Sequence, residues 1–268
     1  MVTFKYFFTN PIKKFVHDGG YTSIFRTIGF IGDSLSSGEH ESFSNGEKGF
    51  HDYFEYSWGQ FIARKCGLKA IIFSKGGLSC KEFFDYYIKE VKNPFTDENR
   101  CQAYVVALGV NDLNHLAEYY PEGFGSLEDV DWQNEDNNKQ SFVGQYVRII
   151  QKLKKFEPKC RIFVMSFPRE CSLAKSRKDK GRLIIDFLLK LPLKFEYLYV
   201  LNIWKYAPTY GKKFKEKYFC GGHMNALGYK FTADMVMTYI DYYINKFPDD
   251  FKQVAFIGKG VHNEKEKW

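Results

Sequence analysis

The sequence lacks the cysteine patterns of metal sites and redox centres. Its six cysteines, at positions 66, 80, 101, 160, 171 and 220, form no Cys-x-x-Cys pair and no Cys/His spacing typical of zinc sites. Scattered cysteines of this kind are typical of free thiols in a reducing compartment. We therefore expect no metal site.

Long apolar runs are also missing. No stretch approaches the roughly 20 apolar residues that a membrane-spanning helix needs. The first fifteen residues, MVTFKYFFTNPIKKF, contain a short apolar patch but no basic start, no sustained apolar stretch and no small-residue cleavage site. If Met1 is the native start, these absences predict a soluble cytoplasmic protein without a membrane partner.

The overall composition excludes disordered and collagen-like chains. Hydrophobic residues make up 44% and charged residues 26% of the 268 residues, as in ordinary globular domains. This length suits a single α/β unit with insertions. Aromatic residues are abundant, at 19%. We expect most of these rings in the core, because large side chains bury the most apolar area, and a minority could line a sugar-stacking cleft.

The chain carries a net charge of +7, with denser basic clusters at 175–182 and 212–217. Such clusters are usually solvated faces, although they could also attract an anionic partner. Neither cluster accompanies a recognisable nucleic-acid module, so we expect no nucleic-acid partner. The sequence does not indicate an oligomeric state.

Five short segments rich in β-branched and aromatic residues alternate with longer helical patterns. They are typical of buried parallel strands, which are apolar on both faces, and they span 27–32, 69–73, 103–108, 161–167 and 197–203. The helical patterns lie near 56–66, 80–91, 140–156, 173–189 and 225–246. This alternation predicts a three-layer α/β/α sandwich around a five-stranded parallel sheet, with its ligand site beyond the carboxyl ends of the strands.

We expect one domain over residues 27–246, flanked by an N-terminal extension, 1–26, and a C-terminal extension, 247–268. No internal repeat or linker is visible. Residues 118–139 are acidic, rich in asparagine and without periodicity. They predict either an insertion over the ligand-binding edge of the sheet or a surface excursion.

Four loops carry residues that can do chemistry: GDSLSSG at 32–38, SKGGLS at 74–79, GVND at 109–112 and GGHMN at 221–225. A serine on a tight turn can expose its hydroxyl, a glycine can bring a backbone N–H close to a ligand, and an Asn amide can stabilise a developing oxyanion. Each loop also has a plain structural explanation, as a helix-capping turn, a glycine-rich turn, an Asn turn or a solvated histidine.

The order of these four loops resembles the SGNH (GDSL-type) hydrolase superfamily over residues 27–246. The residues matching the name-giving positions are Ser34, Gly77, Asn111 and His223. Gly77 is preferred to Gly76 because family sequences usually place a Ser or Thr two residues later, as Ser79 is here. The resemblance implies a flavodoxin-like fold, Ser34 as nucleophile, His223 as general base, and an oxyanion hole formed by Ser34, Gly77 and Asn111, without a cofactor.

One departure from the family concerns the support of the histidine. The family usually has Asp-x-x-His, but the position three before His223 is Cys220, and a thiol is a weak hydrogen-bond acceptor. Either a backbone carbonyl holds His223 in a Ser-His dyad or a carboxylate arrives from another loop. Glu170 and Glu216 are candidate carboxylates. We favour the dyad, because neither glutamate has the family spacing.

The resemblance implies a serine esterase acting through an acyl-enzyme. We favour deacetylation of a carbohydrate, because the sequence predicts a soluble chain, shows no amphipathic lid and is rich in aromatics that could stack on sugar rings. The alternatives are a lipase or acyl thioesterase of the same superfamily, which a chain-length series of esters would separate, and a carbohydrate-binding protein impaired in catalysis, which would not react with a fluorophosphonate. The partner would be a small-molecule or carbohydrate ester.

Overall fold

The computed structural model describes residues 10–16, 18–170 and 175–268. Its centre is a five-stranded parallel sheet in the order β4-β1-β5-β6-β7. The strands are β1 Thr27–Gly32, β4 Lys69–Ser74, β5 Ala103–Ala107, β6 Arg161–Met165 and β7 Leu198–Leu201. The chain passes from β1 to β4 on one side and then to β5 on the other side of β1. The connections on the two sides of β1 therefore run in opposite directions along the sheet, and such a reversal opens a crevice at the carboxyl end of the strand.

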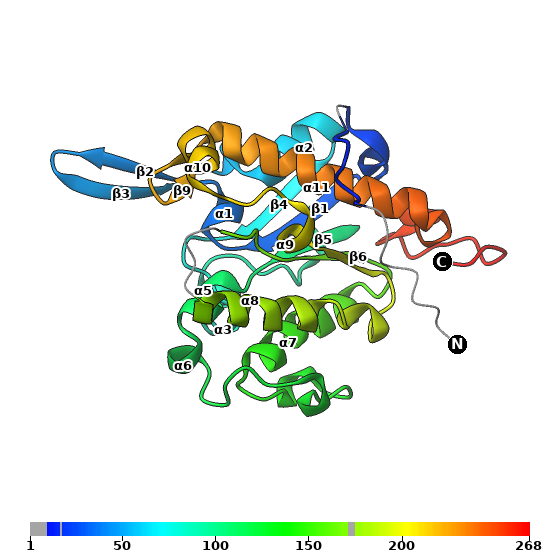
Figure 1. Ribbon diagram of the computed structural model, residues 1–268. Coiled ribbons are helices and arrows are strands. Elements are labelled where there is room, and N and C mark those ends of the chain that lie inside the picture. The colour runs from blue at the N-terminus through cyan, green and yellow to red at the C-terminus, as the bar shows by residue number, and fades with distance from the viewer. Residues whose placement is uncertain (1–9, 17, 171–174) are drawn as a thin grey trace.

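Helices cover both faces of the sheet (Figure 1). On one face lie α2 Trp58–Cys66 and α11 Ala226–Lys246, and on the other lie α7 Phe142–Phe156 and α8 Lys175–Leu188. Polar side chains cap these helices: the Ser57, Ser141 and Asn225 side chains accept hydrogen bonds from backbone N–H groups of the first turns. The predicted three-layer α/β/α sandwich is confirmed.

The two faces of the sheet build two hydrophobic clusters. Side chains of successive strand residues point to opposite faces, so Phe30 packs toward α2 and α11 whereas Ile31 packs toward α7 and α8. The rings of Phe30 and Trp58 meet edge to face, with centroids 4.9 Å apart. Many of the aromatic residues lie in these clusters, as expected.

All five predicted strands are present, with ends shifted by at most a few residues, and the predicted helices match with small differences. The helix expected at 80–91 is divided into α3 Cys80–Glu82, a π-helical turn at Phe83–Tyr87 and α4 Ile88–Glu90. The helix expected at 173–189 begins at Lys175 within the described part of the chain, and positions 173 and 174 lie outside it.

Several short elements were not anticipated by the sequence patterns. The largest is a hairpin of β2 Glu39–Ser44 and β3 Glu47–Asp52, which projects from the body of the molecule (Figure 1). A second hairpin pairs two strands of two residues each, β8 Phe219–Cys220 and β9 His223–Met224. Short α-helices also occur at α1 Ser34–Ser37, α5 Val110–Asn114, α6 Leu116–Tyr119, α9 Ile203–Tyr206 and α10 Lys212–Tyr218, and several single turns of 3-10 helix lie in the connecting loops.

Both flanking segments pack on the sandwich. The Val16 N–H donates to the Thr238 hydroxyl of α11, 3.0 Å away. At the other end, the carbonyl of Val254 accepts from the Gln102 amide at 2.9 Å. The expected insertion at 118–139 runs along α7, where Lys155 pairs with Glu135 at 2.9 Å, so it is a surface excursion.

The remaining expectations concern thiols, charge and membranes. Cysteines 66, 80, 101, 160 and 220 are free, and Cys171 lies outside the described residues. The basic cluster at 212–217 forms α10, with Lys212, Lys213 and Lys217 exposed, whereas the side chains of most of the cluster at 175–182 are not described. Within the described ranges, no helix combines the length and apolarity that crossing a membrane requires.

Candidate active site

Ser34 stands at the turn that follows β1. The Asp33 carboxylate accepts a hydrogen bond from the Leu35 N–H at 3.0 Å and so caps α1. The next two serines are buried: Ser36 bonds to the Ser74 hydroxyl at 2.9 Å, and Ser37 bonds to Asp52. Ser34 itself is half-buried and lines a cavity of about 210 Å³.

The same cavity is lined by the other two polar residues predicted for the site, Asn111 and His223. Asn111 lies in α5, directly after β5, and its amide donates to the Leu78 carbonyl at 3.2 Å, which ties the loop after β5 to the loop after β4. Its neighbour Asp112 is fully buried and accepts from the Cys80 N–H at 2.8 Å. Three segments far apart in sequence therefore meet at the crevice beside β1.

The glycine loop after β4 lies next to this cavity rather than in its lining. Lys75 to Leu78 form a turn closed by a backbone hydrogen bond, and Gly77 has φ +79°, which favours glycine. A Cβ on Gly77 would meet open space, whereas one on Gly76 would collide with the Glu39 carboxylate. The oxyanion role of Gly77 stays a prediction.

His223 lies between two carboxylates of β2. Its Nδ1 is 2.7 Å from Glu41 Oε1, and its Nε2 is 2.9 Å from Glu39 Oε1. Among the described residues, these are the carboxylates in contact with the ring. Glu41 thus occupies the position at Nδ1 that we expected a backbone carbonyl to fill.

The two glutamates named from the sequence pair elsewhere. Glu170 lines the cavity, but its carboxylate accepts from Lys215 at 2.9 Å. Glu216 is on α10 and pairs with Lys212 at 3.9 Å. Sequence reasoning missed Glu39 and Glu41, and the signal that could have found their hairpin is the Asn45-Gly46 turn, since Asn-Gly is the strongest short-range hairpin signal.

The hairpin geometry explains why both glutamates reach one ring. Residues two apart on a strand point to the same side, so Glu39 and Glu41 share a face of β2. Asn45 and Gly46 both have positive φ, 55° and 81°, as the tight turn between β2 and β3 requires. Phe50 is directly opposite Glu41, and its ring stands edge to face with His223 at a centroid distance of 5.9 Å.

The Glu41 carboxylate is well supported. Its side chain is 7% exposed, and it accepts from Lys48 and from the Gly222 N–H, each at 2.8 Å. Although burial alone would raise it, the hydrogen bonds from Lys48, His223 and Gly222 bring the pKa of Glu41 below its ordinary value. A Cβ at Gly221 or Gly222 would collide with this carboxylate, so the glycine pair before His223 makes the close approach possible.

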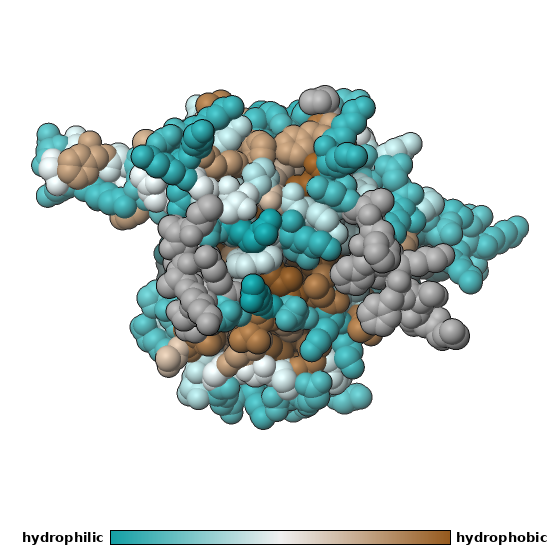
Figure 2. Space-filling view, in the orientation of Figure 1, coloured by the Kyte–Doolittle hydropathy of each residue, from teal (hydrophilic) through white to brown (hydrophobic). Residues whose placement is uncertain are grey.

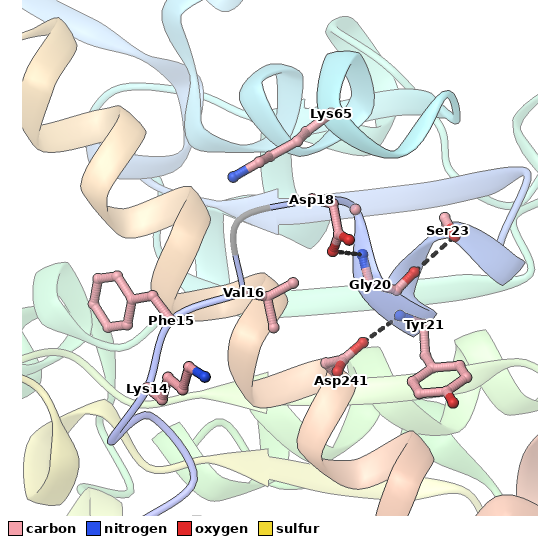
Figure 3. A pocket seen from close by; sticks show the side chains of 10 residues that line it. Lys14, Phe15, Val16, Asp18, Gly20, Tyr21, Ser23, Lys65 and Asp241 are labelled. Atoms are coloured by element: carbon pink, nitrogen blue, oxygen red, sulfur yellow. Dashed lines mark hydrogen bonds between the residues drawn. The ribbon is translucent and has the colours of Figure 1, made fainter.

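The larger cavities of the molecule lie away from these groups. One of about 1000 Å³ is formed by residues 14–16, 18–21 and 23 with Lys65 and Asp241. Figure 3 shows that its carboxylates turn toward backbone N–H groups: Asp18 accepts from Gly20, and Asp241 accepts from Tyr21. Another, of about 790 Å³, lies between α8, β7 and α11, where Figure 2 shows apolar side chains gathered in the middle of the face.

The site offers acid–base and nucleophilic groups. Nowhere in the described parts of the chain do three or more His, Cys, Asp or Glu side chains gather as metal ligands would. The arrangement places a hydroxyl, an imidazole supported by a buried carboxylate, and an amide donor around one cavity, which is what acyl transfer through a serine requires.

Comparison with solved structures shows the same fold at low sequence identity. A family two carbohydrate esterase from Clostridium thermocellum, in complex with cellohexaose, has a TM-score of 0.55 and 16% identity over 83% of this chain. This chain covers 65% of that protein, just under two thirds of its length. No curated protein sequence matches.

Two further structures are similar. A carbohydrate esterase family 2 enzyme plus carbohydrate binding domain from Corynascus thermopiles has a TM-score of 0.54 and 16% identity, covering 82% of this chain and 67% of that one. A protein from Lactobacillus plantarum has a TM-score of 0.55 and 12% identity, covering 81% and 97%. The model of the GDSL-like lipase/acylhydrolase family matches residues 28–236. The resemblance to SGNH hydrolases is therefore confirmed, and the chain belongs to the GDSL-like lipase/acylhydrolase family of hydrolases.

Proposed function

We propose that this protein is a serine esterase that removes an acyl group, in the first place acetyl, from a carbohydrate. The observation that carries the proposal is the shared cavity of Ser34 and His223, together with the 2.7 Å contact between His223 Nδ1 and the buried Glu41 carboxylate. A carboxylate at Nδ1 holds the imidazole in the tautomer whose Nε2 can act as a base, and it stabilises the imidazolium that forms.

In the proposed mechanism, His223 Nε2 takes the proton of the Ser34 hydroxyl as its oxygen attacks the ester carbonyl. The carbonyl oxygen becomes an oxyanion, held by the Asn111 amide and the backbone N–H groups of Ser34 and Gly77. When the C–O bond of the ester breaks, His223 returns the proton to the leaving alcohol. Water then attacks the acyl-enzyme with the same proton relay and releases the acid.

The shape of the site supports a short acyl group. A cavity of about 210 Å³ is smaller than the roughly 300–1,000 Å³ of typical drug-sized ligand sites. An acetyl group needs little of this room, whereas a long acyl chain would need an apolar extension of the cavity. The carboxylate of Glu170, which accepts from Lys215, makes part of its wall polar.

An exposed ring beside the histidine supports a sugar as the alcohol. Phe50 is 55% exposed and stands against His223, so one face can stack on a pyranose ring while the ester reaches Ser34. Solved carbohydrate esterases share the fold, and one of them is in complex with cellohexaose. These two observations favour a carbohydrate ester over a lipid.

The decisive experiment is intact-protein mass spectrometry after treatment with a fluorophosphonate. Wild type should gain one adduct and Ser34→Ala none, and Ser34→Ala should hydrolyse p-nitrophenyl acetate on the order of 10⁴-fold more slowly. Ser44→Ala is the matched control, because Ser44 is an exposed serine at the outer end of β2. A Ser34→Ala protein that is still labelled or still active would place the nucleophile elsewhere.

A further inference from the structure

A second, smaller cavity adjoins the one that Ser34 lines. This small cavity has a volume of about 40 Å³ and lies at the carboxyl ends of β1, β5 and β6. The two cavities share five lining residues: Asp33, Leu35, Val110, Phe167 and Pro168. Asp33 and Leu35 flank Ser34 in the sequence, so the small cavity begins at the turn that carries the proposed nucleophile.

The burial of its lining indicates on which side the small cavity is accessible. One end is formed by residues that are at most 3% exposed: Ser36, Trp58, Leu108 and Ser166. The half-buried lining residues are Ala107, Met165 and four of the five shared ones, Leu35, Val110, Phe167 and Pro168. The small cavity is therefore accessible mainly from the side of the Ser34 cavity.

The wall of the small cavity suits an alkyl group. Eight of its eleven lining residues are apolar. The three polar side chains already have hydrogen-bond partners: Ser36 bonds to the Ser74 hydroxyl, Ser166 accepts from the Trp204 N–H, and Asp33 accepts from the Leu35 N–H. A polar group that entered would lose its water without gaining a free partner, whereas an alkyl group loses nothing of this kind.

The two cavities differ in their relation to the proposed base. His223 lines the larger cavity but not the small one. In the proposed mechanism, His223 returns a proton to the leaving alcohol, so the alcohol must lie in the larger cavity. The acyl chain extends from the ester carbonyl carbon in a different direction, and the small cavity is an apolar space beside Ser34 that can receive it.

The volume of the small cavity limits the length of such a chain. Because a cavity needs roughly 10–15 Å³ to hold one water molecule, the small cavity has room for about three groups of that size. The methyl group of an acetyl ester fits with space to spare. A butyryl chain fills the small cavity, and a hexanoyl chain exceeds it.

We infer that the small cavity is the acyl pocket of this protein, and that Met165 and Ala107 set the longest acyl chain it accepts. The inference rests on the proposed function of Ser34 and His223, and it narrows the substrates to esters of short-chain acids, from acetyl to butyryl. Among the described residues, Met165 and Ala107 are the half-buried lining residues that the larger cavity does not share. Substituting them therefore changes the acyl side of the site and leaves the alcohol side intact.

The test is kcat/KM for p-nitrophenyl esters from acetate to octanoate, which all release the same alcohol. Wild type should lose on the order of tenfold or more between butyrate and hexanoate, since one methylene group in an apolar pocket changes kcat/KM by roughly 10- to 200-fold. Met165→Ala, which enlarges the pocket, should raise the hexanoate-to-acetate ratio on the order of tenfold. Ala107→Val, which fills it, should lower the butyrate-to-acetate ratio by a similar factor.

Met235→Ala is the matched control. Met235 is a fully buried methionine of α11 that lines neither cavity, so its substitution should leave both ratios as in wild type. Each ratio compares two substrates on the same protein, so a partial loss of folded protein cancels. If Met165→Ala does not fold, Ala107→Val provides the test.

The outcomes separate this inference from the proposed function. If a fluorophosphonate labels Ser34 and acetate is hydrolysed, but neither substitution changes the chain-length profile, the acyl pocket is wrong and the esterase proposal stands. A wild type that hydrolyses octanoate as fast as acetate would also overturn the acyl pocket and leave Ser34 as the nucleophile. If Ser34 is not labelled, the proposed function fails and the acyl pocket fails with it.

Discussion

Glu41 takes, at Nδ1 of His223, the position that related hydrolases give to an aspartate three residues before the histidine. Here that position is Cys220, which is exposed and directly opposite His223 in the β8–β9 pairing. The carboxylate instead comes from a segment 182 positions away. In the proposed mechanism, the group that supports the base is therefore defined by its position in space and not by its spacing in sequence.

This substitution leads to a paired prediction for Cys220→Asp. In the wild-type background it should bring no rise in kcat for p-nitrophenyl acetate, because Glu41 already occupies Nδ1. In a Glu41→Gln background, which should lose on the order of 10⁴-fold through the wrong tautomer and the lost charge, Cys220→Asp should restore part of the activity. A clear rise from Cys220→Asp alone would show that Glu41 is not an effective partner.

At the scale of elements, the hairpin β2–β3 brings three side chains into contact with His223: Glu39, Glu41 and Phe50. They share one face because Phe50 is paired with Glu41 and strand residues alternate sides. A one-residue slip in the register between β2 and β3 would place Phe50 on the face opposite to Glu39 and Glu41. The pairing register of β2 and β3 therefore determines which side chains of the hairpin reach His223.

Phe50 provides the test of the sugar-stacking face. Phe50→Ala should raise KM for an acetylated oligosaccharide several-fold, roughly tenfold at most, because loss of ring stacking removes on the order of 1 kcal/mol. It should leave KM for p-nitrophenyl acetate nearly unchanged. Phe43→Ala is the matched control, since Phe43 is exposed farther out on the same face. Equal changes for both substrates would argue against a sugar-specific contact.

The same hairpin shows where prediction from sequence stops. The sheet strands could be found because each is an apolar run, and Ser34, Asn111 and His223 could be placed because they follow or flank such elements. Residues 39–52 are mostly polar or charged and give no comparable signal apart from Asn45-Gly46. The contact between this hairpin and His223 is tertiary, and a local sequence pattern cannot predict it.

At the scale of the whole molecule, the site rests on buried carboxyl groups. Asp33 lines the cavity, Asp112 is the buried neighbour of Asn111, and burial raises the pKa of each, that of Asp33 to about 7. Asp112 Oδ2 is a buried atom for which the described residues offer no hydrogen-bond partner. Such groups destabilise the folded state when they are charged.

The raised pKa of Asp33 leads to a prediction of how the free energy of unfolding depends on pH. The folded protein holds a proton on Asp33 up to about pH 7, whereas the unfolded chain releases it near 3.8. The free energy of unfolding should fall as pH rises between these values, by up to roughly 4 kcal/mol, and the loss should be complete above them. Asp33→Asn should remove this slope. Urea unfolding of both proteins at about pH 5 and about pH 8 measures it, and equal slopes would contradict the prediction.

The long separation between Glu41 and His223 also bears on the order in which the enzyme is made. As the chain leaves the ribosome, Ser34 and both glutamates emerge early, and His223 follows only after all five strands of the sheet. In the proposed mechanism, a nascent chain has Ser34 without its base until His223 has been made and α11 packs on the sheet. If the proposed function is right, chains that end before His223 should have no esterase activity even when they contain Ser34 and both glutamates.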